Sequence, residues 1–109
     1  MADERVEKVF EAIEIAKSTG KLAKGANEAT KALERGTAKL VAVAKDVQPP
    51  EIVMHLPLLA KEKGVVCVTV GTKDELGTAA GLDVGTTAIA IIQEGEAKKI
   101  IAELSNKSE

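Results

Sequence analysis

The sequence predicts an α/β fold, a three-layer α/β/α sandwich in which about four strands form a mixed sheet with helices on both faces. Stretches with helical spacing of apolar residues alternate with short apolar runs along the 109 residues. These runs are apolar throughout rather than at every second residue, as is typical of strands buried on both faces. Because no internal repeat or flexible linker interrupts the alternation, residues 1–109 are interpreted as one domain.

Two helices and two strands are expected before the first proline. Apolar residues at helical spacing between glutamates and lysines predict the first helix, which Gly20 ends. Gly36 follows the second helix, and the apolar run AKLVAVA suits a buried strand. In chain order, the predicted elements are helix 3–18, edge strand 21–24, helix 26–35 and strand 38–44.

The later elements follow a proline pair, Pro49-Pro50, which separates the second strand from the next helix. That helix contains Pro57, where we expect its course to adjust, and Gly64 ends it. The predicted elements are helix 51–63, strand 65–70, helix 73–80, loop 81–85, strand 86–92 and helix 94–105.

Composition and charge limit both the core and the partners. Phe10 is the only aromatic residue, so the core is predicted to consist of valine, isoleucine, leucine and alanine. The scarcity of aromatic rings argues against RNA-binding modules that stack bases on them. The formal net charge of −2 argues against nucleic acid, but residues 20–45 carry six basic and two acidic side chains. That segment is either an anion-binding patch or a solvated helix face, and charge alone favours the second interpretation.

Enzyme signatures are missing from the sequence, which has no nucleophile motif, zinc-ligand spacing or complete phosphate-binding loop. The single histidine, His55, lies among apolar residues and is expected to be packed with one hydrogen-bond partner. The single cysteine, Cys67, excludes an internal disulfide and is expected to be a small buried core residue. Gly71 is expected to make a strand-to-helix turn, with Asp74 and Glu75 favouring the helix start. We therefore predict no enzyme and neither a metal nor a cofactor.

The sequence also predicts a protein that does not enter a membrane. No stretch approaches the roughly 18 apolar residues of a membrane span. The N-terminus is charged from residue 3 and has no signal-peptide pattern. A cytoplasmic location is therefore expected, and the single cysteine fits a reducing compartment.

The start of the predicted helix 26–35 is the first feature that could carry chemistry. Asn27, Glu28 and Lys31 are spaced so that they share one helix face. In one interpretation they only stabilise the helix, with Asn27 as its cap and a Glu28–Lys31 ion pair. In the other, Glu28 accepts from guanine N–H groups, Lys31 donates to guanine O6 or N7, and Asn27 bonds either kind of group. Lys24 and the helix N-terminus would then favour phosphate, and the residues alone leave both interpretations open.

The second feature is the loop Gly81-Leu82-Asp83-Val84-Gly85, in which two apolar side chains lie between glycines. Leu82 and Val84 either turn back into the core or stay exposed and pack against bases. Splayed RNA bases need apolar surface, and a chain with one aromatic residue has to supply it from aliphatic side chains.

These two features, in this order, resemble the archaeal ribosomal protein L7Ae family over essentially the whole chain. The resemblance is carried by GANEATKALERG at 25–36, PPEIVMHLPLLAKEKGV at 49–65 and ELGTAAGLDVG at 75–85. The family binds kink-turns and the related kink-loops, sharply bent RNA elements with tandem sheared G·A pairs beside a short bulge. Its archaeal members serve in the large ribosomal subunit, in box C/D and H/ACA guide ribonucleoproteins and in RNase P.

The resemblance implies a non-enzymatic protein that recognises and stabilises the bent RNA. It implies a monomer when free, which joins other proteins on ribosomal RNA, guide RNA and RNase P RNA. The G·A pairs would be read by Asn27, Glu28 and Lys31. The implied RNA-binding residues are Lys24, Gly25, Asn27, Glu28, Lys31, Arg35, Gln48, Ile52, Lys73, Leu82, Asp83 and Val84.

The other implied roles concern the backbone and the unpaired nucleotides of the RNA. The implied backbone contacts are those of Lys24, Arg35 and Lys73. Loop 82–84 would lie beside flipped-out bases, and Gln48 and Ile52 near the extruded bulge nucleotide. Three alternatives stay open: a sister ribosomal or recoding-factor protein of the same fold, a small enzyme, and a scaffold that binds only proteins.

Overall fold

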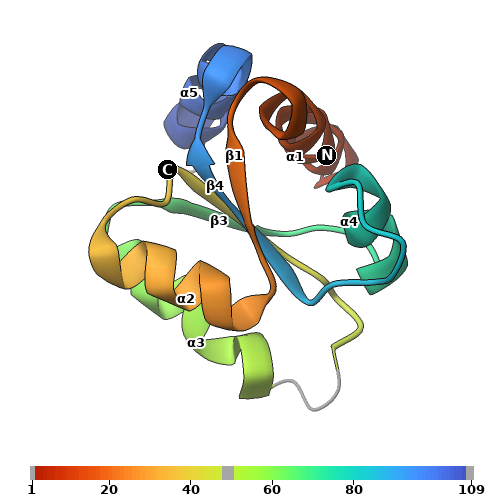
Figure 1. The fold of residues 1–109 in the computed structure, drawn as a ribbon. Coiled ribbons are helices and arrows are strands. Elements are labelled where there is room, and N and C mark those ends of the chain that lie inside the picture. Colours follow the sequence, from red (N-terminus) through yellow and green to blue (C-terminus); the bar gives the residue numbers. More distant parts are fainter. Residues whose placement is uncertain (1, 48–50, 108–109) are drawn as a thin grey trace.

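The structure, a computed structural model, describes residues 2–47 and 51–107 (Figure 1). Helices and strands alternate along this part of the chain, with a short 3₁₀-helix before the last helix. In chain order, the elements are α1 (Ala2–Thr19), β1 (Lys21–Lys24), α2 (Ala26–Arg35), β2 (Leu40–Val43), α3 (Glu51–Glu62), β3 (Val66–Thr69), α4 (Lys73–Ala79), β4 (Ala88–Gln93), η1 (Gly95–Ala97) and α5 (Lys98–Lys107).

The four strands found in the described residues form one mixed sheet in the order β1-β4-β2-β3. Strand β4 pairs antiparallel with both β1 and β2, whereas β2 and β3 are parallel. Helices α2 and α3 cover one face of the sheet, and α1, α4 and α5 cover the other (Figure 1). The predicted three-layer sandwich is therefore confirmed, and the predicted strand 21–24 does lie at an edge.

The core of the described residues is aliphatic, as composition predicts. Its largest fully buried side chains include Ile13, Leu33, Leu40 and Ile89, which come from both helical layers and from the sheet. Phe10 is only half-buried and packs against this core from outside. Burial of apolar surface, at about 25 cal/mol per Å², is the main favourable term that holds the layers together.

Three predicted strands, 38–44, 65–70 and 86–92, are longer than the observed ones, and in the first and last of them burial continues before the strand begins. Ala38 is buried, but its N–H donates to the Ala32 carbonyl at the end of α2 rather than to a strand. Thr86 is buried as well, and its N–H donates to the Lys73 carbonyl in α4. An apolar run therefore marks buried backbone, and tertiary hydrogen bonds decide where the strand begins.

Two packing predictions need correction. His55 is exposed, not packed, because α3 faces the core through Leu56 and Ala60. Its one hydrogen-bond partner among the described residues is Thr30 in α2, at 2.7 Å between Nε2 and Oγ1. Cys67 is half-buried, since β3 is an outer strand, and burial raises the pKa of its thiol to about 11. The thiol is therefore neutral near pH 7 and a poor nucleophile.

Candidate nucleic-acid interface

The two features singled out in the sequence meet at one end of the sheet because β1 and β4 run antiparallel. The end of β1 lies beside the start of β4, where the Gly25 N–H donates to the Ala88 carbonyl at 2.7 Å. The end of β2 is fixed there too, through the Ala44 N–H and the Thr87 carbonyl at 2.9 Å. The start of α2 and the loop that precedes β4 therefore occupy the same end of the molecule (Figure 1).

Gly25 forms the N-cap of α2 with φ 102° and ψ 157°, a conformation that L-residues with side chains rarely adopt. Within residues 2–47 and 51–107, no side chain caps this helix, so the interpretation of Asn27 as the cap is wrong. The reason is geometric, since β1 runs into α2 through Gly25 and places Asn27 at the second helical position. The Asn27 amide is exposed.

Glu28 and Lys31 form the expected ion pair, with 3.7 Å between Oε2 and Nζ. Their side chains are 58% and 57% exposed, and pairs of this kind contribute only about 0.2–0.5 kcal/mol. An RNA base could separate the two groups at little cost. Arg35, four residues beyond Lys31, extends this exposed polar face to the last turn of α2.

A hollow of about 390 Å³ lies at the start of α2. Its lining combines a cation, an amide, a carboxylate and backbone N–H groups. The first intrahelical bond runs from the Ala29 N–H to the Gly25 carbonyl at 2.9 Å, so the three preceding helical N–H groups lie outside that ladder. The lining residues are Lys24, Gly25, Ala26, Asn27, Glu28 and Thr87.

The loop over 81–85 is held against α4 by backbone contacts. The Leu82 N–H donates to the Gly77 carbonyl at 2.8 Å, and a Cβ on Gly77 would clash with the Val84 carbonyl. Of the two apolar side chains, Leu82 is half-buried against the core, whereas Val84 is 71% exposed. Leu82 therefore turns back towards the core as the first interpretation predicts, while Val84 stays exposed; packing of Val84 against bases stays a prediction.

Helix α4 is itself fixed at its start. The Thr72 Oγ1 accepts from the Glu75 N–H at 3.2 Å, while Glu75 Oε1 accepts from the Thr72 N–H at 2.9 Å. The Lys73 N–H donates to Asp46 Oδ1 at 2.8 Å, which ties the helix to the segment after β2. Gly71 does lie between β3 and α4, and its lack of a side chain leaves room for Glu75.

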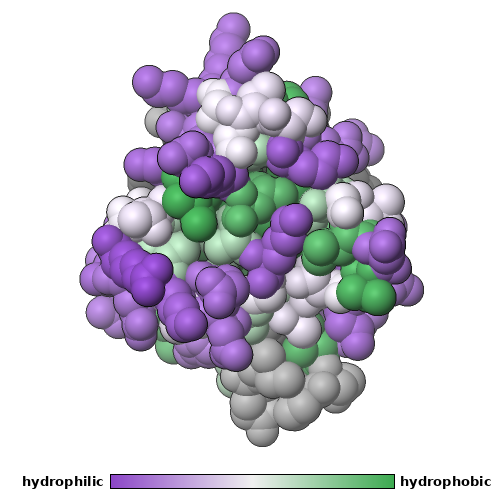
Figure 2. Space-filling view, in the orientation of Figure 1, coloured by the Kyte–Doolittle hydropathy of each residue, from purple (hydrophilic) through white to green (hydrophobic). Residues whose placement is uncertain are grey.

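Most of the predicted site residues lie at this end or along the exposed face of α2. Lys24, Asp83 and Arg35 are exposed, and Lys73 is half-buried. Gln48 lies outside the described residues, as does the side chain of Ile52. Hydrophilic side chains cover α2, and apolar ones appear at the loop between α4 and β4 (Figure 2).

Three residues that build this end of the molecule were not predicted from the sequence: Asp46, Gly77 and Thr87. Their roles come from hydrogen bonds or close contacts with segments distant in the sequence. Only Gly77 gave a local signal, because a glycine inside a helical segment indicates close backbone packing. Asp46 and Thr87 gave none.

Comparison with known proteins assigns the chain. The sequence model of the ribosomal protein L7Ae/L30e/S12e/Gadd45 family matches residues 7–101. The chain belongs to this family. The members of this family are structural proteins rather than enzymes, so the alternative that the protein is a small enzyme is excluded.

The L7Ae-family chain is also similar to individual proteins. It is 54% identical to a large ribosomal subunit protein eL8 of Halobacterium salinarum, over 94% of this chain and 86% of the relative. It is 57% identical to the eL8 protein of Haloquadratum walsbyi, over 92% and 83% respectively. The chain is also similar to the solved structure of the Giardia lamblia 15.5kD RNA binding protein, with a TM-score of 0.89 and 36% identity over 95% of this chain and 87% of that one.

Two further observations concern other kinds of site in the described residues. No group of three or more histidine, cysteine, aspartate or glutamate side chains there could hold a metal ion. None of the helices in that part of the chain has the length and apolar character needed to cross a membrane.

Proposed function

We propose that this L7Ae-family protein binds RNA and that it recognises and stabilises kink-turns and kink-loops. One observation carries the proposal: the polar start of α2 and the apolar loop over 81–85 lie at the same end of the sheet. A kink-turn offers both kinds of partner, because sheared G·A pairs expose polar base edges and the adjoining bulge exposes base faces. The names of the similar proteins, large ribosomal subunit eL8 and an RNA binding protein, support this choice.

In this proposal, the start of α2 reads the G·A pairs. Glu28 accepts from guanine N–H groups, Lys31 donates to guanine O6 or N7, and Asn27 bonds either edge. The hollow beside Gly25 brings backbone N–H groups to the same RNA. Lys24 lines that hollow and would contact a phosphate, as would Arg35 further along the exposed face of α2.

The loop after α4 covers the unpaired side of the bend. The exposed side chain of Val84 packs against flipped-out bases, while Leu82 anchors the loop on the core. Asp83 lies between them, and Lys73 at the start of α4 supplies a phosphate contact. We also propose that Gln48 and Ile52 contact the extruded bulge nucleotide.

The mechanism is a shift of the RNA population rather than catalysis. A free kink-turn sequence samples open and bent forms, and a protein surface that fits only the bent form favours it by its differential affinity. The surface is pre-formed, since Gly25 and the α4 contacts fix both of its halves. A net charge of −2 limits non-specific binding, which depends largely on phosphate neutralisation.

We further propose that residues 1–109 act as one RNA-binding domain that is monomeric when free and cytoplasmic. Its RNA partners would be kink-turns in the large-subunit ribosomal RNA, box C/D and H/ACA guide RNAs and RNase P RNA. It would bind there beside the other proteins of those particles.

The deciding experiment is a binding titration at fixed salt with two RNAs that differ only in the kink-turn. One carries tandem G·A pairs and the bulge, and the other has Watson–Crick pairs in place of the G·A pairs. We expect a large loss of affinity for the second RNA, because base contacts and shape carry the specificity. Equal affinity for both would mean that the contacts are mainly electrostatic and would overturn the proposal.

A further inference from the structure

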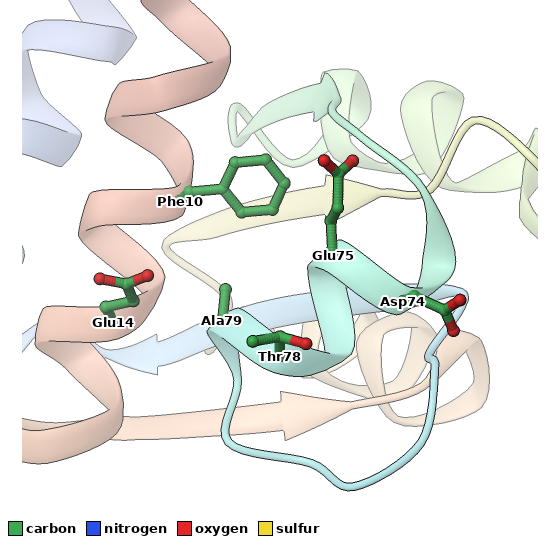
Figure 3. A pocket seen from close by; sticks show the side chains of 6 residues that line it. All are labelled: Phe10, Glu14, Asp74, Glu75, Thr78 and Ala79. Carbon is green, nitrogen blue, oxygen red and sulfur yellow. The ribbon is translucent and has the colours of Figure 1, made fainter.

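The only aromatic side chain of the protein lies at the surface between α1 and α4, away from the start of α2. Phe10 projects from α1 towards α4 and lines a hollow of about 430 Å³ between the two helices (Figure 3). A second hollow, of about 540 Å³, lies along α1 and shares Phe10 and Glu14 with the first. We name the first hollow the Phe10 groove; it is lined by Phe10, Glu14, Asp74, Glu75, Thr78 and Ala79.

Contacts with α4 and the segment before it hold the Phe10 ring in this position. A Cβ on Gly71 would come within 3.3 Å of the ring Cζ, so a glycine there leaves space for the ring. Glu75 stands beside the ring, and Ala79 forms part of the wall (Figure 3). The ring is half-buried, and it therefore offers an apolar surface to a partner without leaving the core contacts that hold it.

The rim of the groove is negatively charged. The two hollows together are lined by five carboxylates and one amine, that of Lys8, whose Nζ lies 2.9 Å from Glu103 Oε1. None of the five carboxylates forms an ion pair with a basic side chain in the described part of the chain. Glu75 uses Oε1 to bond Thr72, whereas Glu14 is exposed one helical turn beyond Phe10.

This charge decides which class of partner fits. The carboxylates would repel RNA phosphates, whereas they and the face of the aromatic ring would both attract a positively charged side chain. A guanidinium stacks on an aromatic face and binds carboxylates through two parallel N–H groups, which an ammonium cannot do. Asp74 points away from the ring, towards the loop before β4, so it contributes only to the negative electrostatic potential of the groove (Figure 3).

We propose that the Phe10 groove docks an arginine-containing basic segment of a neighbouring protein, with a guanidinium over the Phe10 ring and against Glu14. This proposal rests on the proposed function at one point only: RNA binding would place the protein in an RNA-rich particle, in which basic segments of other proteins lie close to it. The groove would leave the start of α2 free for RNA, so that one molecule joins an RNA bend to a second protein.

The test is an NMR titration of the isotope-labelled protein with a blocked peptide of alternating arginine and glycine residues. We expect amide shifts confined to α1 and α4, and binding about threefold weaker for the matched lysine peptide. Two variants remove the proposed contacts: Phe10→Leu keeps apolar volume without the ring face, and Glu14→Gln removes one charge. Both should weaken binding, whereas Glu62→Gln, an equal charge change at an exposed position of α3, should leave it unchanged.

Three results would overturn the inference. Glu62→Gln could weaken binding as much as Glu14→Gln, which would indicate general charge attraction. Spermidine could produce the same shifts as the peptide, which would indicate a site for small cations. The peptide could also leave α1 and α4 unchanged.

A parallel kink-turn RNA titration of Phe10→Leu and Glu14→Gln separates this inference from the proposed function. Unchanged RNA affinity together with weaker peptide binding supports the groove. Loss of both would place Phe10 and Glu14 in the RNA surface or the fold, which contradicts the inference. Failure of the unmodified protein to distinguish the two RNAs would refute kink-turn recognition without affecting the peptide result.

Discussion

The two halves of the candidate RNA interface are built in different ways. At the start of α2, the residues that shape the surface are neighbours in the sequence: Gly25 sets the cap, and Glu28 pairs with Lys31 one turn later. The loop over 81–85 instead depends on α4, through the Leu82 N–H bond to Gly77 and the close approach of the Val84 carbonyl to the same glycine.

The comparison shows how the same interface can tolerate changes in one half and not in the other. The face of α2 follows from helical spacing, so a substitution there removes a contact and leaves the backbone in place. The loop has no regular structure, so its shape lasts only while the α4 surface below it keeps its form.

The broadest expected effect is that of Gly77→Ala, which should lower both the stability of the fold and the RNA affinity by displacing the loop half. Alanine is favoured over glycine by about 1 kcal/mol in a helix, but its Cβ would clash with the Val84 carbonyl and overpacking costs about 1–3 kcal/mol. We expect a lower free energy of unfolding in urea denaturation, together with weaker kink-turn binding.

The control is Thr78→Ala, an exposed neighbour on the same helix, which should bind RNA as the parent does. Because Gly77 acts through the loop, Gly77→Ala should add little to a variant that already carries Leu82→Ala and Val84→Ala. Additive losses of RNA affinity would show that Gly77 does not act by positioning the loop.

The next effect is expected for a substitution in the α2 half of the candidate RNA interface. Glu28→Ala should cost roughly 1–3 kcal/mol of kink-turn affinity, measured by titration, because a base-edge contact is lost. Its free energy of unfolding should change by less than about 0.5 kcal/mol, since only a weak exposed ion pair is removed. The matched control is Glu34→Ala, with the same charge change on the same helix; an equal loss there would assign the effect to charge alone.

A smaller effect is expected at the start of α4. Thr72→Ala removes the side chain that accepts the Glu75 N–H, and loss of such a cap costs about 0.5–2 kcal/mol of stability. Thr72→Ser keeps the hydroxyl and should restore most of the thermal midpoint. If Thr72→Ala left the amide signals of residues 81–85 unchanged in NMR spectra, the start of α4 would not support the loop. The loop half of the interface would then not depend on α4 in the way described.

The smallest effect is expected for His55→Ala, which tests whether the α2 face depends on a contact with the neighbouring helix α3. Thr30 Oγ1 donates to the Ala26 carbonyl at 2.8 Å, so it accepts from the Nε2–H of His55. His55→Ala should lower stability by less than about 1 kcal/mol, because the bond is exposed. RNA affinity should stay at the parent value, and a clear loss in the titration would show that the α2 face is not set locally.

Several features were predictable because they depend on local order along the chain. Apolar spacing placed α2 at the same residues, 26–35, as the structure does. The same spacing put Asn27, Glu28 and Lys31 on one exposed face, because helical geometry fixes side-chain direction within a turn. The aliphatic core followed from composition, since one aromatic residue leaves only smaller side chains to fill it.

Other features depend on contacts between distant segments, and the sequence alone determined none of them. Pairing of β1 with β4 brings Gly25 beside Ala88 and so joins the two halves of the interface. Tertiary packing also exposes His55, and it turns Phe10 to the surface between α1 and α4. The physical reason is that local spacing fixes which face a side chain takes on its own element, whereas strand pairing and helix packing fix which faces meet.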